Sequence, residues 1–471
     1  MRITIHRGNQ IGGCITEIVS SMGTRIFVDL GHNLPKGDEE SEDELASEEA
    51  IADLIGDARA IFYTHMHGDH VELFQYVPDG VDQYIGPLAL NIINIMKAKY
   101  EHMSHAEALK ENSDKCLRKL EPFKTYRKGR PIAIDDITVT PFQVSHSSAD
   151  SYMLKIKCDG KTILHTGDFR GHGYMGEGIY KVVDKYHIAG HVDILITEGT
   201  NVDNNGKSMR PESALKEEFK EVFRQYKNTF IICSSTDADR LESIYSANKE
   251  FAQRPFIADT YQKDIIGLIA QQAEEGRRLY HFGPNKIYGY SPTNEKMDYM
   301  MRRYGFVMLI RRSEKFQSYL YKILPFCKPE ETCLVYSQYH GYIEKREGNT
   351  AFNQELFDYV EQFREKSCTI KDRIHTSGHV SKQDLVRLCE LINPALIIPI
   401  HKDEKADFVS ILPDELRMKV CEYEYSKDGI DIEFDPPQGT TRPTGVGRWE
   451  QHPKDTNSTA KKKTNNNPGA L

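Results

Sequence analysis

Short runs of Ile, Val and Phe recur along the first part of the chain, and turn-forming residues bound each run. Such runs are typical of buried β-strands that end in tight turns. The segments that show the pattern are residues 2–6, 25–31, 60–65, 137–146, 152–157, 162–168 and 193–199. Between the third and fourth of them, residues 90–120 carry apolar side chains at helical spacing, which predicts one or two helices.

The pattern changes after about residue 203, where helical and strand-like segments alternate. They follow one another at residues 213–226, 229–235, 237–251 and 255–259. Alternation of this kind predicts a parallel sheet with crossover helices, in a module distinct from the first. A further strand-like run, at 332–337, extends the module to about residue 372.

Beyond this module the chain is expected to return to the first sheet. The returning segments are strand-like at 373–379, helical at 381–392 and very apolar at 394–401. From 436 to 471 the chain is rich in Pro, Gly, Asn, Ser and Lys, which predicts a disordered tail because such a segment cannot bury enough surface to fold. The predicted domains are a first domain in two parts, residues 1–202 and 373–435, an inserted domain at 203–372, and the tail.

The composition limits the class of protein. Of the 471 residues 39% are hydrophobic, and the net charge of −9 argues against an all-over basic coat. No run approaches the roughly 18 consecutive apolar residues of a membrane span, and the N-terminus lacks the apolar core of a signal peptide. Nine cysteines are scattered without a C-x-x-C pair, so we expect reduced thiols and neither a disulfide framework nor a thiolate zinc site. A globular, cytoplasmic protein without a membrane segment is predicted.

The most informative segment is THMHGDH, which follows a predicted strand. His65 and His67, two positions apart, lie on the same side of extended backbone and can meet one cation. After the turn at Gly68, Asp69 and His70 can face a second cation. Imidazole with carboxylate, and no thiolate, suits Zn²⁺, with Mn²⁺ as the alternative.

Three further candidate ligands stand at the ends of other predicted strands: His146, Asp168 and His401. A catalytic zinc needs three or four ligands, so two metals require donors from outside the histidine-rich segment. Taken singly, each of the three is more often structural, as a turn cap or as a histidine bonded to a carbonyl. Their recurrence at strand ends, in a chain that also carries THMHGDH, favours metal binding.

The segments THMHGDH, VSHSSADS and HTGDFR, with the aspartate and glycine of FVDLG, resemble the metallo-β-lactamase fold. In that α/β fold, an αββα sandwich, the metals lie along one edge. Later segments narrow the resemblance, because ITEGTNV, HTSGHVSKQDL and IIPIH are similar to the three signature motifs of the β-CASP nucleases. The combination is closest to RNase J. The resemblance covers about residues 1–425, and residues 203–372 correspond to the inserted α/β β-CASP domain.

The resemblance implies two zinc ions and their ligands. One ion is expected on His65, His67 and His146, and the other on Asp69, His70 and His401, with Asp168 as a bridge. A hydroxide between the ions would be the nucleophile, since two close cations lower the pKa of shared water and spread the charge of the phosphorus centre. Glu198, in the first β-CASP motif, is expected to orient a ligating imidazole, and the less favoured alternative is a cap of the following turn.

The segment HTSGH is implied to bind the scissile phosphate. His379 is a candidate to assist charge development or to protonate the leaving oxygen, and His375 and Ser377 are candidate phosphate contacts. The alternative for both histidines is a hydrogen-bonded turn. Ser234 and Ser235 open a helix, where free amide groups favour phosphate, although hydroxyl groups before a helix usually cap it.

Four other side chains are weaker candidates for substrate contacts. Arg240, in the helix after Ser235, is a possible second phosphate contact. Tyr336 and Tyr339 are possible stacking residues, although packing is the more usual role of a tyrosine. Lys402 stands where RNase J-like chains usually carry glycine, and it is a possible phosphate contact. RNase J generally has a folded C-terminal domain that helps it to dimerise, whereas this chain passes into the low-complexity tail, so a homodimer is left open.

These features together predict a zinc-dependent ribonuclease that hydrolyses phosphodiester bonds of single-stranded RNA, held mainly through phosphate contacts. The predicted catalytic residues are Asp69, Asp168, Glu198 and His379. Exonuclease and endonuclease modes both stay open. The alternatives are a β-CASP nuclease that acts on DNA, a metallohydrolase for a small ester, thioester or lactone, and a metal-bearing scaffold that binds RNA without cutting it. The complete ligand set argues against the scaffold.

Overall fold

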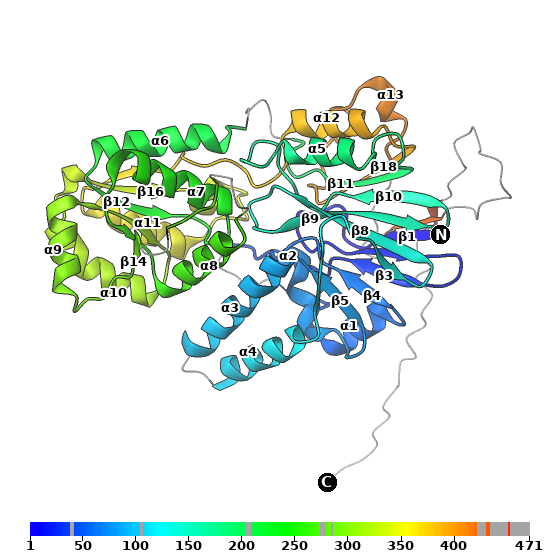
Figure 1. Ribbon diagram of the computed structural model, residues 1–471, viewed down its shortest axis with the longest axis horizontal. Coiled ribbons are helices and arrows are strands. Elements are labelled where there is room, and N and C mark those ends of the chain that lie inside the picture. The colour runs from blue at the N-terminus through cyan, green and yellow to red at the C-terminus, as the bar shows by residue number, and fades with distance from the viewer. Residues whose placement is uncertain are drawn as a thin grey trace, which may run out of the picture.

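The structure of the protein is a computed structural model. It describes residues 1–37, 42–103, 107–203, 209–273, 279–283, 286–421, 430–433 and 451–452. For residues 100–103, 107–111, 430, 431, 433, 451 and 452 it describes the backbone alone. Three sheets organise the chain, two in one lobe and the third in the other (Figure 1).

The first lobe is built on two sheets that pack face to face. The first sheet, in the order β20-β19-β1-β2-β3-β4-β5-β6, has strands β1 (Arg2–Ile5), β2 (Thr16–Val19), β3 (Arg25–Val28), β4 (Ala60–Phe62), β5 (Asp82–Ile85), β6 (Lys124–Thr125), β19 (Ile430–Glu433) and β20 (Gln451–His452). The second sheet, in the order β18-β11-β10-β9-β8-β7, has strands β7 (Ile132–Ile134), β8 (Ile137–Val144), β9 (Ser151–Cys158), β10 (Lys161–His165), β11 (Ile194–Glu198) and β18 (Leu396–Ile400). Ile3 of β1 and Ile156 of β9 belong to one buried cluster, which joins the facing surfaces into a sandwich.

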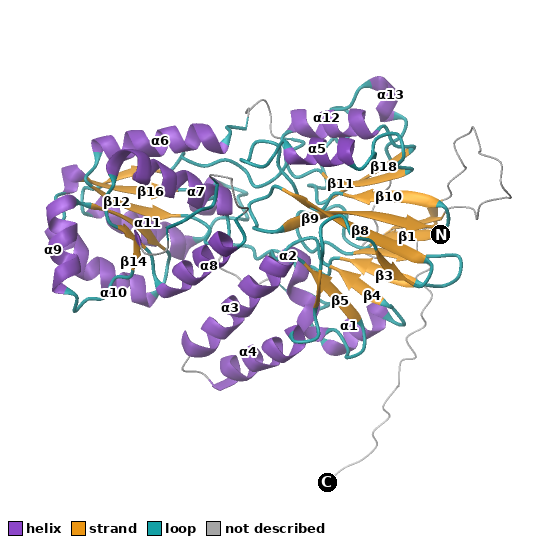
Figure 2. Ribbon diagram, in the orientation of Figure 1, coloured by secondary structure: helices purple, strands orange, loops and turns teal. Residues whose placement is uncertain are grey.

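Helices cover the outer faces of this sandwich (Figure 2). They are α1 (Glu48–Ile55), α3 (Pro87–Met103) and α4 (Glu107–Leu120) on the first sheet, and α5 (Gly178–Lys185), α12 (Lys382–Ile392) and α13 (Asp414–Arg417) on the second. Ile51 of α1 shares a core with Phe27 of β3. Leu388 of α12 shares another with Leu195 of β11. Alternate residues of each strand therefore face the helices. The predicted α/β class is confirmed.

The third sheet is parallel throughout and has the order β14-β13-β15-β12-β16-β17. Its strands are β12 (Asn228–Ile232), β13 (Phe256–Ile257), β14 (Ile287–Tyr288), β15 (Phe306–Ile310), β16 (Thr332–Tyr336) and β17 (Thr369–Lys371). Its helices are α6 (Glu212–Gln225), α7 (Ala238–Ala247), α8 (Thr260–Gln271), α9 (Glu295–Tyr304), α10 (Glu314–Ile323) and α11 (Gln354–Glu365). The parallel sheet that the alternating pattern predicts is confirmed, while the domain limits at 203 and 372 stay predictions.

Residues 373–379, expected to be a strand, have no regular secondary structure. Side chains of the inserted domain donate hydrogen bonds to backbone carbonyls of this segment, which in a sheet would accept them from a neighbouring strand. Arg210 donates to the carbonyl of His375 at 2.9 Å, and Ser337 Oγ donates to that of Ile374 at 2.6 Å. The segment is thus anchored by side chains, which apolar periodicity does not reveal.

The returning part also differs in detail from the expectation. β18 pairs with β11 in the second sheet, and only β19 reaches the first sheet, beside β1. Within the predicted tail, Gln451–His452 pair with β19 as β20, and the other residues from 436 onward lie outside the described residues. In the part of the chain that the structure describes, no helix combines the length and apolar character that a membrane span requires.

Candidate metal centre

The THMHGDH segment runs from β4 into the short helix α2 (Gly68–Val71), and Asp29 holds its start in place. The Asp29 carboxylate accepts hydrogen bonds from the Thr64 amide at 2.6 Å and the Thr64 hydroxyl at 2.8 Å, and it contacts His70 Nδ1 at 2.8 Å. Gly31 is required because a Cβ there would lie 1.7 Å from the carbonyl oxygen of Asp69. The aspartate and glycine of FVDLG therefore shape the segment that carries the candidate ligands.

His65, His67 and His146 form the first group of donors. His67 Nδ1 lies 3.2 Å from both His65 Nε2 and His146 Nε2. His146 Nδ1 donates to the carbonyl of Gly378 at 2.7 Å, which leaves a lone pair on Nε2 for a metal. Burial and the neighbouring imidazoles lower the pKa of His65 and His146 well below the ordinary value. Both are therefore neutral, as metal ligands must be.

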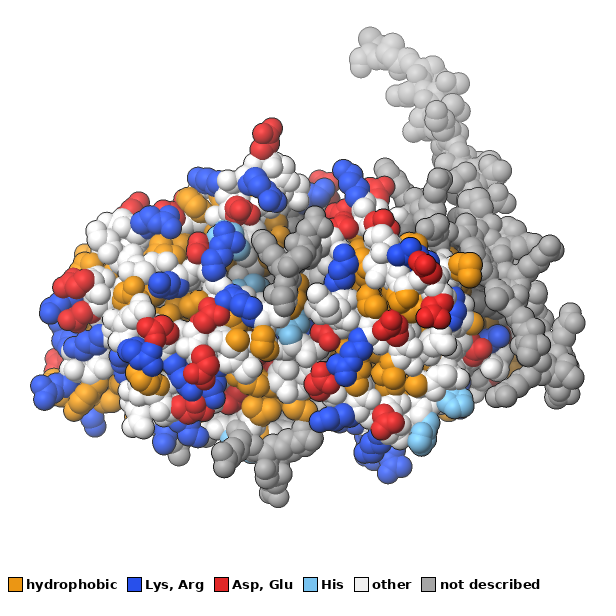
Figure 3. Space-filling view, turned by 90° about the horizontal axis from the view of Figure 1, so that it is seen from above, with side chains coloured by type: hydrophobic (Ala, Val, Ile, Leu, Met, Phe, Trp, Pro, Cys, Tyr) orange, Lys and Arg blue, Asp and Glu red, His pale blue; other side chains and the backbone are white. Residues whose placement is uncertain are grey.

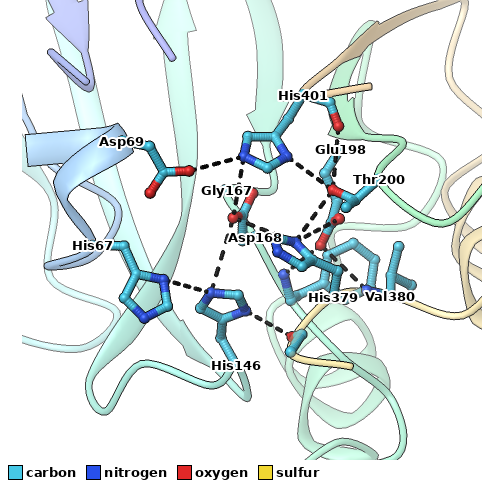
Figure 4. Close-up of polar contacts among 12 residues, drawn as sticks. His67, Asp69, His146, Gly167, Asp168, Glu198, Thr200, His379, Val380 and His401 are labelled. Atoms are coloured by element: carbon cyan, nitrogen blue, oxygen red, sulfur yellow. Dashed lines mark hydrogen bonds and ion pairs between the residues drawn. The ribbon is translucent and has the colours of Figure 1, made fainter. Parts of the chain in front are cut away.

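Asp69, His70 and His401 form the second group. Figure 4 shows Asp168 between His146 of the first group and His401 of the second. Asp69 Oδ2 is 3.3 Å from His401 Nε2. Asp168 Oδ2 is 3.2 Å from His70 Nε2 and 3.8 Å from His401 Nε2. The same oxygen is 3.9 Å from the Nε2 atoms of two histidines of the first group. One carboxylate oxygen is thus within reach of both groups.

Two atoms at the centre of this cluster are buried without the hydrogen bonds that burial normally requires. Among the described residues, neither His70 Nε2 nor Asp168 Oδ2 makes a hydrogen bond, although the two atoms lie 3.2 Å apart as an ion pair. His401 also adopts a left-handed backbone, with φ 48°, which is strained for a residue other than glycine. The imidazole and carboxylate donors, the unsatisfied atoms and the strain all fit a site for divalent cations.

The charges of the second group favour a cation. Despite burial, the histidine charges, first that of His401 and then that of His70, hold the pKa of Asp168 well below its ordinary value. Burial opposes the protonation of His401, but Asp168 and Asp69 outweigh it and raise the pKa of His401 to about 9. The carboxylates are therefore ionised, and they attract positive charge to this position.

Glu198 lies against His379, and its carboxylate is within 4.8 Å of ligand atoms of Asp168 and His401. Its carboxylate accepts from the Phe169 amide at 2.9 Å and the Val380 amide at 3.3 Å, and it lies 3.0 Å from His379 Nδ1. Burial opposes the protonation of His379, but Glu198 and then Asp168 outweigh it and raise its pKa to about 9. The structure thus brings His379 to the centre and places Glu198 behind it.

The expected role of Glu198, orienting a ligating imidazole, stays a prediction. Two other residues contact ligating imidazoles directly. Thr200 Oγ1 lies 2.8 Å from His401 Nδ1 and 3.2 Å from His379 Nδ1, and Asp29 holds His70. Partners of this kind fix the orientation of a ligating ring. The sequence analysis did not identify Thr200. Its position two residues after Glu198, in ITEGTNV, is the one signal that points to it.

His375 contacts two arginines of the inserted domain, Arg210 and Arg240. Arg240 Nη1 donates to His375 Nδ1 at 3.3 Å, and burial with the Arg240 charge lowers the pKa of His375 to about 3. Ser377 Oγ accepts from the His379 amide and from Asn201 Nδ2, both at 3.2 Å, so it shapes the HTSGH loop. Phosphate binding by His375 and Ser377 stays a prediction.

Arg240 does not have the expected role of a phosphate contact. It is 1% exposed, and its guanidinium donates to Glu212 at 2.9 Å and to the carbonyl of Ser337 at 3.0 Å. Because these buried acceptors hold it, it stabilises the inserted domain. Ser234 and Ser235 are partly exposed near the start of α7, and their phosphate contact stays a prediction.

Two further expectations concern Tyr336 and Lys402. Tyr336 packs in the core of the inserted domain and has no exposed surface. The prediction that it stacks on a base is therefore wrong. Tyr339 is 56% exposed. Lys402 is 8% exposed, burial lowers its pKa, and its Nζ donates to the carbonyl of Asp403 at 3.3 Å. A phosphate contact by Lys402 stays a prediction.

The fold and the donor groups first define a class, that of α/β proteins with buried histidine and carboxylate side chains that can hold metal. Comparison with known proteins adds a particular similarity, to proteins named ribonuclease J. The relative from Helicobacter pylori strain B128 is 24% identical over 411 residues, which cover 83% of this chain and 54% of the relative. The one from Mycobacterium tuberculosis strain H37Rv is 24% identical over 263 residues, 54% of this chain and 44% of the relative. The one from Sinorhizobium meliloti is 20% identical over 385 residues, 80% of this chain and 63% of the relative.

The chain spans about half the length of the Helicobacter relative. No protein-family model matches it. Among solved structures, a crystal structure of a protein of unknown function from Enterococcus faecalis V583 has a TM-score of 0.66 at 18% identity and covers 92% of this chain and 99% of its own. That likeness shows a shared fold. The sequence relatives, at low identity but over much of the chain, support an RNase J-like family.

Proposed function

We propose that the protein is a metal-dependent ribonuclease of RNase J type, with a metallo-β-lactamase-like sandwich and an inserted β-CASP-like domain. The observation that carries the proposal is the convergence of seven donor side chains, from four separate places in the chain, on two adjacent groups. The relatives named ribonuclease J support cleavage of RNA as the reaction. Single-stranded RNA as the substrate class is part of the proposal.

The residues that would hold two zinc ions, or manganese in their place, are His65, His67 and His146 for one and Asp69, His70 and His401 for the other, with Asp168 shared between them. Divalent cations bound there lower the pKa of water and neutralise the charge that develops on the phosphoryl group. The protein's own part is to hold the donors. Asp29 and Thr200 fix the rings of His70 and His401 from behind.

His379 protonates the leaving oxygen in the proposed reaction. Its side chain is 22% exposed, so substrate can reach it, and the pKa of about 9 keeps it an imidazolium at neutral pH. Glu198, without exposed surface, orients the ring through Nδ1 and cannot itself meet substrate.

His379→Ala is expected to lower the rate of RNA cleavage by about 10²–10⁴-fold, the usual contribution of a positioned acid. Bound metal, measured by elemental analysis, is expected to be unchanged. Glu198→Gln, which keeps the shape of the side chain, should give a smaller loss. Because His379 Nδ1 is only 3.4 Å from Asp168 Oδ2, a parallel loss of metal would show instead that His379 is a ligand.

Exposed aromatic rings lie near the second group. Tyr342, in the short helix at His340–Ile343, is 42% exposed, and partial burial together with the nearby charge of Asp69 raises its pKa. Its ring stands edge-on to that of Tyr339, with 5.4 Å between centroids. Figure 3 shows histidine side chains at the surface in the middle of the face seen from above, among interspersed acidic and basic groups. Unpaired bases that approach this centre can stack on the tyrosines.

Tyr342→Ala is expected to weaken the binding of single-stranded RNA by roughly 1–3 kcal/mol, the cost of losing one stacked base. The affinity is best measured by fluorescence anisotropy in the Asp168→Asn background, where the probe stays intact. Tyr321→Ala is the matched control, because Tyr321 is 83% exposed on α10. Equal affinities for the two variants would remove Tyr342 from the binding site.

The proposed function is tested by digestion of matched single-stranded RNA and DNA, with Zn²⁺ or Mn²⁺ and after chelation. Metal-dependent cleavage of RNA is expected, and identically purified Asp168→Asn protein controls for contaminating nucleases. Preferred cleavage of DNA would favour the DNA nuclease. Turnover of a chromogenic ester without nuclease activity would favour a small-molecule hydrolase, and binding without cleavage would favour the scaffold.

A further inference from the structure

Cys14 lies at the second donor group, although THMHGDH begins only at Thr64, far along the sequence. It stands in the loop between β1 and β2 and is 4% exposed. Its Sγ lies within 4.8 Å of a ring nitrogen of His70 and of His401. All nine cysteines lie among the described residues, and Cys14 alone belongs to such a group of potential ligands.

Backbone hydrogen bonds fix Cys14 at this position. Its amide donates to the carbonyl of Asp69 at 2.9 Å, and its carbonyl accepts from the amide of Gly31 at 3.0 Å. Gly12 and Gly13, with φ of 86° and 66°, make the turn that brings the loop there. The loop is thus joined directly to the segment that carries Asp69 and His70, so the thiol moves with the donors.

The second observation is the unsatisfied nitrogen of His70. Nε2 is buried and makes no hydrogen bond among the described residues, with the Asp168 carboxylate 3.2 Å away, while Nδ1 is held by Asp29. An imidazole with a carboxylate and a thiol beside it is placed as one of several donors around a cation.

We propose that Cys14 is a thiolate ligand of the metal held by Asp69, His70 and His401, and that it makes this position selective for Zn²⁺ over Mn²⁺. Soft thiolate ligands prefer zinc, whereas carboxylate and water suit manganese. The thiol loses its proton to solvent when the S–metal bond forms, so no oxidant or reductant is needed. The inference rests on the proposed function only in that the donor groups bind metal.

The test is the absorption spectrum of the full-length protein loaded with Co²⁺ in place of zinc. A cobalt–thiolate bond gives an intense near-ultraviolet charge-transfer band, which imidazole and carboxylate ligands do not give. We expect the band in the unchanged protein and in Cys327→Ser, a partly exposed cysteine of the inserted domain. We expect its loss in Cys14→Ser and Cys14→Ala.

Competition with a chelator adds a second measurement. Cys14→Ser is expected to lower the affinity for one of the two zinc ions. The loss should be at least the roughly 10–100-fold that removal of a ligand-orienting residue costs, and the affinity for Mn²⁺ should change little. Two bound cobalt ions without the band in the unchanged protein, or a band that persists in Cys14→Ser, would overturn the inference and leave the nuclease proposal standing. Failure to bind any metal would overturn both.

Discussion

Asp168→Asn is expected to reduce cleavage of single-stranded RNA by about 10³-fold or more, which exceeds the 10–100-fold cost of losing a residue that merely orients a ligand. Asp168 Oδ2 lies within 4 Å of ring nitrogens from both donor groups, and it is buried without a hydrogen-bond partner among the described residues. Asparagine keeps the shape of the side chain but removes the charge that both groups share. The variant is therefore expected to fold and to hold less metal.

The measurement combines a cleavage assay, elemental analysis of bound metal and a thermal unfolding curve. Asp135→Asn is the matched control, because Asp135 is about half exposed and pairs with Arg59 on the surface. Asparagine also tolerates the left-handed backbone at that position, where φ is 49°. Full activity of Asp168→Asn, in a preparation free of other nucleases, would refute the proposed function.

Arg170→Ala is expected to lower the free energy of unfolding by about 3–5 kcal/mol, because it leaves buried carboxylates without their partner. Arg170 has almost no exposed surface, and its Nη2 lies 2.8 Å from Asp237 and 2.9 Å from Asp239. Its Nη1 lies 3.5 Å from Glu212. Arg170 comes from the sandwich and the three carboxylates from the inserted domain, so the same change loosens the junction between the two lobes.

Calorimetric unfolding of the variant and of Arg387→Ala gives the comparison. Arg387 pairs with Glu177 on the surface, where solvent screens the charges, so its loss is expected to leave the unfolding temperature unchanged. Arg170→Lys keeps the charge without the forked geometry, so its unfolding temperature should lie between those of Arg170→Ala and the unchanged protein. If Arg170→Ala unfolds like the unchanged protein, the carboxylates find other partners and the junction does not depend on this arginine.

Local sequence was sufficient to predict the candidate ligands where one segment carries both the apolar pattern of a strand and a ligating residue at its end. The apolar runs at β3, β4, β8 and β10 predict strands, and the polar residue after each run marks the edge at which donors can meet. His146, Asp168 and His401 were found in this way. By contrast, β2 was missed because its buried Thr16 and Glu17 interrupt the apolar pattern, and 373–379 looked like a strand although side chains hold it as a loop.

The sequence by itself determined the α/β class, the parallel sheet of the inserted domain and the identity of the candidate donors, because periodicity and strand-end residues are properties of single segments. Only the tertiary structure decided that Glu198 lies behind His379, that Thr200 lies behind His401, that Arg240 is buried in an ion pair and that Cys14 stands beside His70. These contacts depend on how two sheets pack and how distant loops meet, and no pattern within one segment encodes that packing.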